Sequence, residues 1–173
     1  HIAARKDSLR RGELDVADFT VKGAVACVRR LHAGGIHLCL ASGTDQAFVR
    51  EEAELLGYAD AFTGGIFGAV GDVSKYSKKM VIDRILREHR LSGAQLVCFG
   101  DGPVEIRETK KRNGLAVGVA SDEMRRFGLN PEKRARLIHA GADIVIPDFS
   151  QQDTLFEYLG ISGTPQRSST SGS

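Results

Sequence analysis

The sequence predicts an α/β fold, with a Rossmann-like parallel sheet covered by helices in three layers. Short apolar runs of strand length alternate along the chain with longer segments whose apolar residues recur at helical spacing. A chain of 173 residues, of which 42% are hydrophobic, is also long enough to bury one full apolar core. One principal α/β domain is therefore expected.

The individual elements follow from the local patterns. Gly34 and Gly35 end one helix just before an apolar strand, and Pro103 suits the first position of a helix, where a missing N–H has no partner to lose. Helices are expected over residues 3–12, 23–31, 48–56, 77–88, around 103–106, and over 131–139 and 152–159; strands are expected over 36–41, within 61–70, and over 95–99, 116–120 and 143–147. Residues 161–173 are expected to form a flexible tail, because apolar residues no longer recur at helix or strand spacing from residue 162 on.

Composition and charge argue against several classes of partner. Lys and Arg total 24 against 22 Asp and Glu, and the two signs are interleaved, so no nucleic-acid partner is expected. No run approaches the roughly 20 apolar residues that a membrane span needs, which predicts no membrane partner and a cytoplasmic location. Cys27, Cys39 and Cys98 lie in apolar runs without metal-site spacing, which favours buried, reduced thiols.

Three polar groups follow predicted strands or begin predicted helices. Ser42 lies in the stretch LASGTD, Lys78 in YSKK, and Asp101 in FGDGPVE. Taken singly, each has an ordinary structural explanation: a helix N-cap, a solvated lysine and a turn closed by a carboxylate. Because the carboxyl ends of parallel strands share one edge of a sheet, the three together predict a ligand site at that edge.

In this order the three groups resemble motifs two, three and four of the haloacid-dehalogenase-like phosphohydrolases, of the phosphoglycolate phosphatase and β-phosphoglucomutase type with a small helical cap. The resemblance covers about residues 19–159 and implies the fold predicted above. It implies that Ser42, the Gly43 amide and Thr44 bind a phosphoryl group, although Thr44 also suits a helix cap. It further implies that Lys78 neutralises the phosphate and that Ser42 and Lys78 are catalytic.

The family's acidic GDxxxD motif corresponds to residues 100–105, with Glu105 in place of the second Asp. The resemblance implies magnesium as cofactor, Asp101 as its direct ligand and Glu105 as a second metal-site residue that binds a metal water or positions Asp101. A carboxylate nucleophile cannot approach a doubly charged phosphate monoester unless cations offset the repulsion. Lys75 and Lys79 compete with Lys78 for the phosphate; Lys79 points about 100° further around the helix.

The family's first motif, an apolar strand ending in DxDxT, does not occur in this sequence. Residues 15–20 read DVADFT, with DxxD spacing and no buried-strand run before them. The resemblance assigns residues 1–18 to the end of a helical cap and 19–160 to the core domain. We therefore expect no covalent phosphoryl transfer by this chain alone, and a partner in the form of a further N-terminal segment of the same protein. The core sheet would lack one strand, leaving apolar edges unless another segment fills the gap.

The resemblance as a whole implies a magnesium-dependent hydrolase of small phosphorylated metabolites. A noncatalytic, regulatory phosphate-binding module that keeps the anion site without the nucleophile is the main alternative. A dinucleotide-binding domain is disfavoured because no GxGxxG follows a first strand, and the glycines at 64–71 have neither that spacing nor a Walker lysine.

Overall fold

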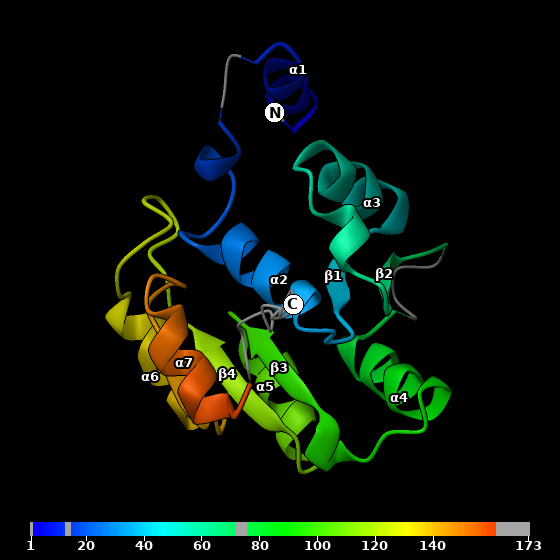
Figure 1. Ribbon diagram of the computed structural model, residues 1–173, viewed down its shortest axis with the longest axis vertical. Helices are drawn as coiled ribbons and strands as arrows, with labels where there is room; N and C mark the ends of the chain where they lie inside the picture. Colours follow the sequence, from blue (N-terminus) through cyan, green and yellow to red (C-terminus); the bar gives the residue numbers. More distant parts are fainter. Residues whose placement is uncertain (1, 13–14, 72–75, 162–173) are drawn as a thin grey trace, which may run out of the picture.

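The computed structural model describes residues 2–12, 15–71 and 76–161 (Figure 1). Helices and strands alternate as expected. In chain order the elements are α1 (Ile2–Arg10), η1 (Val16–Asp18), α2 (Ala24–Ala33), β1 (Cys39–Asp45), α3 (Gln46–Leu55), η2 (Ala59–Ala61), β2 (Gly65–Ala69), α4 (Lys78–Glu88), η4 (Gly93–Gln95), β3 (Val97–Gly100), α5 (Pro103–Lys110), β4 (Leu115–Val119), α6 (Pro131–His139), β5 (Ile144–Ile146) and α7 (Gln152–Leu159). The expected tail from residue 162 on lies outside the described residues.

All strand pairs in the described residues are parallel, but they form two separate sheets. β1 pairs with β2, and β3, β4 and β5 form a second sheet in that order. Within the part of the chain that the structure describes, β1 and β3 each have one unpaired edge. The predicted α/β class is confirmed, with its sheet divided between β1 and β3.

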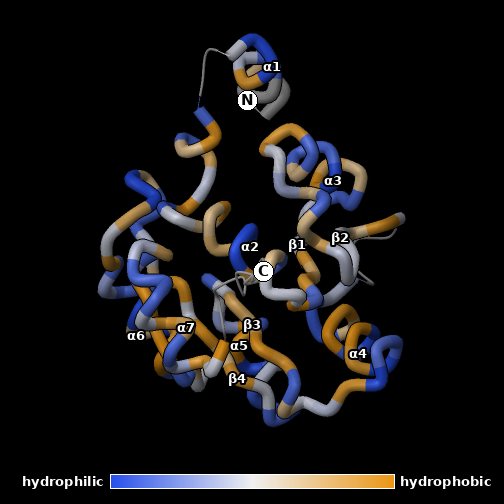
Figure 2. The backbone as a smooth tube through the Cα atoms, viewed as in Figure 1, coloured by the Kyte–Doolittle hydropathy of each residue, from blue (hydrophilic) through white to orange (hydrophobic). Residues whose placement is uncertain are grey.

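The larger sheet is covered by helices on both faces, and β4 is its buried centre. Val117 packs with Cys27 of α2 and Phe156 of α7 on one face, whereas the preceding Ala116 packs with Leu137 of α6 on the other. Successive strand residues point to opposite faces, so this alternation produces the three layers. Figure 2 shows the hydrophobic residues that line β3 and β4.

The first strand differs from the prediction. It spans Cys39–Asp45 instead of residues 36–41, because regular pairing begins only where the Gly64 amide donates to the Leu38 carbonyl at 2.8 Å. Apolar periodicity could not show where the partner strand starts. The helices at 131–139 and 152–159 have the predicted bounds, and the helix expected at 77–88 is α4 with Ser77 as its N-cap.

The first helix lies beside α3, where Arg10 and Glu51 form an ion pair at 2.8 Å (Figure 1). The DxxD stretch that follows caps its own short helix. The Asp15 carboxylate accepts the Ala17 amide, and Asp18 accepts the Asp15 amide. No helix among the described residues has the length and apolar character needed to cross a bilayer.

Candidate functional site

The segment Ser42–Thr44 lies in an irregularity of β1. Ala41 pairs with Phe67 and Asp45 with Ala69, so the intervening part of β1 has more residues than the opposing part of β2. The Ser42 hydroxyl accepts the Thr44 amide at 3.2 Å within this bulge. Bulges turn side chains and amides away from the ladder, which leaves this segment available to a ligand.

The helix after the bulge is capped by Asp45. Its carboxylate accepts the amides of Ala47 at 3.0 Å and Phe48 at 3.3 Å. The backbone of β2 lies very close to this bulge at Gly68. A Cβ added to Gly68 would lie only 2.7 Å from the Thr44 carbonyl oxygen. Asp45 therefore caps α3, and the bulge is held between that cap and Gly68.

Lys78 is the first residue of α4 and points toward Glu105 in the first turn of α5. Ser77 caps the helix through the Met80 amide at 3.2 Å. The Lys78 ammonium lies 3.0 Å from Glu105 Oε1. Lys79 is exposed. A hydrogen bond from Arg112 is the main cause that lowers the pKa of Asp83, and the charge of Lys79 contributes to the same shift. Lys75 lies outside the described residues.

Glu105 is buried and folds back over its own loop. Its side chain is 9% exposed, and Oε1 accepts the Gly102 amide at 3.1 Å in addition to facing Lys78. A Cβ on Gly100 would lie only 2.3 Å from Glu105 Cγ, so glycine leaves the space that this side chain fills. The carboxylate thus orients both the lysine and the turn that carries Asp101.

Asp101 directly follows β3 and is largely exposed, with a side-chain exposure of 67%. Its Oδ2 lies 3.7 Å from the ammonium of Lys133, which also lies 3.1 Å from Glu123 Oε1. Lys133 is only 5% exposed. The sequence reasoning missed this residue, although it shares the buried face of α6 with Leu137, one helical turn later, and that position was the available signal.

A groove of about 380 Å³ brings together three of the predicted site residues, Lys78, Asp101 and Glu105. Residues of α2, β1 and β3 contribute to its apolar lining, among them Leu40 and Phe99. In Figure 1, α2 lies over the space between β1 and β3. Ser42 follows Ala41 of the lining but does not itself line the groove.

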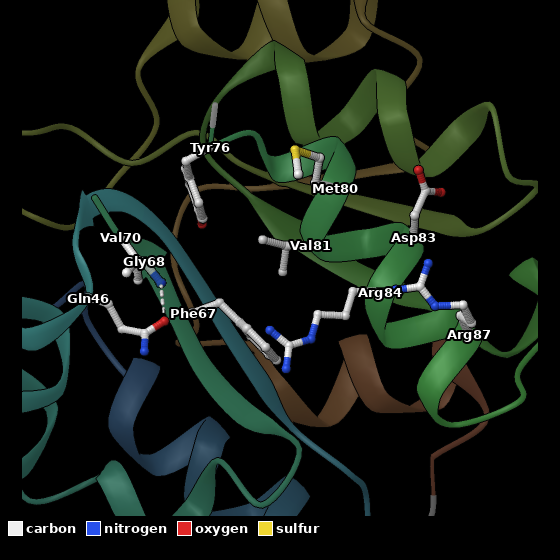
Figure 3. Close-up of a pocket in the computed structure, with 10 residues that line it drawn as sticks. All are labelled: Gln46, Phe67, Gly68, Val70, Tyr76, Met80, Val81, Asp83, Arg84 and Arg87. Carbon is white, nitrogen blue, oxygen red and sulfur yellow. Dashed lines mark hydrogen bonds between the residues drawn. The ribbon is translucent and has the colours of Figure 1, made fainter. Parts of the chain in front are cut away.

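A larger hollow of about 530 Å³ lies between β2 and α4 and contains none of the predicted site residues (Figure 3). Arg84 stacks over Phe67, with its guanidinium 5.2 Å from the ring centre, and also pairs with Glu88 at 2.7 Å. Gln46 Oε1 accepts the Gly68 amide at one side of the hollow (Figure 3). These groups bind one another, so volume alone does not make this hollow the reactive site.

The carboxylate of the groove that is available to a magnesium ion is that of Asp101, whose side chain is 67% exposed. Among the described residues, no group of three His, Cys, Asp or Glu side chains could hold a metal ion. Magnesium usually keeps several waters and binds through one or two carboxylates together with substrate phosphate, so Asp101 fits such a site as a direct ligand. Glu105, which faces Lys78, fits the positioning role better than direct ligation.

The three cysteines are free thiols, and only Cys27 is fully buried. Burial raises the pKa of Cys27 to about 11 and also raises the pKa of Cys39 and Cys98. Thiols with raised pKa values stay protonated near neutral pH and are poor nucleophiles and metal ligands. The cysteines are therefore not candidates for the reactive groups of the site.

A family model described as haloacid dehalogenase-like hydrolase matches residues 3–111, and the chain belongs to this family. The sequence-based resemblance is thus confirmed at the level of the superfamily. No curated protein matches the chain.

Solved structures show the same fold. A predicted phosphatase from Clostridium acetobutylicum is 22% identical with a TM-score of 0.63, over 80% of this chain and 58% of that one. A haloacid dehalogenase family hydrolase from Deinococcus radiodurans, solved with bound phosphate and sodium, is 13% identical with a TM-score of 0.67, over 82% and 60%. β-Phosphoglucomutase from Clostridium difficile is 18% identical with a TM-score of 0.57, over 86% and 61%. The chain therefore spans about three fifths of the length of these structures.

Proposed function

We propose that this chain forms the phosphate- and magnesium-binding part of a phosphatase that acts on small phosphorylated metabolites. The observation that carries the proposal is the shared groove, in which Lys78, Asp101 and Glu105 meet at the carboxyl end of β3. The bulge at residues 42–44 follows the groove residue Ala41 and would supply a hydroxyl and amides to the phosphoryl oxygens.

Each group has a distinct role in this proposal. Lys78 offsets the charge of the phosphate, and Glu105 holds the lysine in place. Asp101 would hold magnesium, which supplies charge neutralisation at the phosphoryl oxygens when bound. Ser42, Gly43 and Thr44 orient the phosphoryl group by hydrogen bonds.

The nucleophile would come from a strand that enters between β1 and β3. Both strands have an unpaired edge in the described residues, and the groove lined by both is largely apolar. A parallel strand placed there would satisfy the open backbone groups on both sides and unite the two sheets. Its carboxyl end would then emerge beside Lys78 and Asp101, where an aspartate could attack phosphorus.

Inorganic phosphate binding by this chain tests the anion site. Lys78→Met should weaken binding by about tenfold or more, because an ammonium–phosphate contact in a partly buried site is a strong charge-assisted bond. Lys79→Met removes the same charge from the adjacent exposed position and should change binding little. Equal effects of the two variants would contradict the proposed anion site.

Turnover of an aryl phosphate with magnesium tests the source of the nucleophile. The chain alone should show background activity, and a peptide with an apolar strand ending in DxDxT, added in trans, should raise both the melting temperature and the turnover. A peptide with the first Asp replaced by Asn should stabilise without turnover. Strong activity of the chain alone that Asp101→Asn abolishes would refute the need for a supplied nucleophile.

One alternative is a noncatalytic phosphate-binding or regulatory module that uses the same anion site around Lys78. This module predicts phosphate binding that depends on Lys78 and no turnover with any strand peptide. The same two measurements therefore separate the two functions.

A further inference from the structure

We propose that Lys133 is an internal cation that competes with a divalent metal ion for Asp101 and thereby sets the metal affinity of the site. The inference rests on the proposed metal-binding role of Asp101, but it concerns a residue outside all three sequence motifs. Lys133 belongs to α6, and its ammonium reaches the loop after β3 from a separate element.

The position of Lys133 is built into the fold. Asn130 caps α6 by accepting the Lys133 amide at 3.0 Å, which fixes the first turn of the helix. The side chain is 5% exposed, although lysine is rarely buried without a partner. Its aliphatic stem is therefore covered by the protein, and only the ammonium needs compensating charge.

Two carboxylates share that ammonium unequally. Glu123 Oε1 lies at hydrogen-bond distance, 3.1 Å, whereas Asp101 Oδ2 lies at 3.7 Å. Both acids are mostly exposed, at 74% and 67% of their side chains. Asp101 is thus held by charge without a short hydrogen bond, and its oxygens remain open to a ligand.

A divalent ion bound to Asp101 would be repelled by the positive charge of the Lys133 ammonium. With a magnesium–oxygen distance of about 2.1 Å, an ion on Oδ2 would lie within roughly 6 Å of the Lys133 nitrogen. Repulsion between charges of +2 and +1 at that separation weakens binding about tenfold even at the dielectric constant of water. The negative charge of Glu123, whose Oε1 lies 3.1 Å from the ammonium, offsets part of this repulsion.

Removing each partner should therefore shift metal affinity in opposite directions. Lys133→Met should tighten divalent binding about three- to tenfold, and Glu123→Gln should weaken it by a similar factor, because the ammonium then has only Asp101 to pair with. Arg134→Met removes a positive charge from the next, exposed residue of α6 and should change affinity less than about twofold.

The experiment titrates this chain and its variants with Mn²⁺, measures free Mn²⁺ by its electron paramagnetic resonance signal, and then displaces the ion with Mg²⁺. Circular dichroism establishes that each variant is folded, and the exposed Glu123→Gln keeps the test valid if Lys133→Met fails to fold. The difference between Lys133→Met and wild type should shrink as salt rises from about 20 mM to about 500 mM, because screening weakens the repulsion.

Asp101→Asn separates the failure of this inference from that of the proposed function. If Asp101→Asn lowers affinity while Lys133→Met leaves it unchanged or weakens it, the competition model is wrong and the metal site stands. If Asp101→Asn has no effect, or if no variant binds the ion, the proposed metal site is wrong and the inference falls with it.

Discussion

The ion pair between Lys78 and Glu105 should contribute more to stability than a surface pair. The two charged atoms lie 3.0 Å apart, and the side chains are 30% and 9% exposed. Exposed pairs contribute about 0.2–1 kcal/mol, whereas breaking a fully buried pair costs about 3–5 kcal/mol. This half-buried pair should therefore show a coupling free energy of about 2 kcal/mol in a double-mutant cycle.

The cycle uses Lys78→Met, Glu105→Gln and the double variant, each unfolded in urea. Gln at position 105 can still accept the Gly102 amide, so the substitution removes mainly the charge. The Arg84–Glu88 pair is a matched control, because its charged atoms are 2.7 Å apart but its side chains are 54% and 47% exposed. Its coupling should be about 0.3–0.5 kcal/mol. Equal coupling in the two cycles would refute the claim that burial of Glu105 strengthens its pair.

Three further predictions concern other parts of the fold. Gly93→Ala should lower the free energy of unfolding by more than about 2 kcal/mol in urea, because its Cβ would lie 1.5 Å from the Arg112 carbonyl oxygen; a smaller loss would mean that the η4 backbone yields easily. Burial acts to raise the pKa of Asp143, but hydrogen bonds from a backbone amide and Lys110 leave it below its ordinary value. Its contribution is therefore present above the unfolded pKa of about 3.9 and lost as pH falls through the folded pKa, so the urea-stability difference between wild type and Asp143→Asn should shrink between about pH 5 and pH 2. Cys27, with a pKa of about 11, should resist iodoacetamide at about pH 8 until urea unfolds the chain, as peptide mass spectrometry would show; modification of the folded protein would contradict its burial.

Local signals were sufficient for most helices but not for the first strand. Ser77 and Asn130 cap α4 and α6 through their own side chains, and such caps are recognisable in sequence because they act within one turn. The bulge at residues 42–44 depends on where β2 pairs with β1, and that register is a long-range property. The order of motifs predicted which strand would carry Ser42, but not the shape of its end.

The site shows the same division between local and long-range information. The sequence predicted that Ser42, Lys78 and Asp101 would meet at one sheet edge. Lys78 and Asp101 line the groove, whereas Ser42 does not. The sequence did not predict Lys133, because a lysine in a polar helix is normally solvated. The spacing of Lys133 to Leu137 indicates burial, but nothing local shows that its ammonium meets Asp101 and Glu123. Only the packing of α6 against the larger sheet reveals that contact.

The glutamate at position 105 makes physical sense once its surroundings are considered. Its extra methylene relative to aspartate lets the side chain fold back over Gly100, where a Cβ would collide with Cγ, and still reach Lys78. A carboxylate committed to an ammonium and a backbone amide is a poor candidate to move onto a metal ion, because leaving would strand a half-buried positive charge. Under the proposed function, the role of direct metal ligand therefore falls to Asp101, whose side chain is 67% exposed and which faces Lys133.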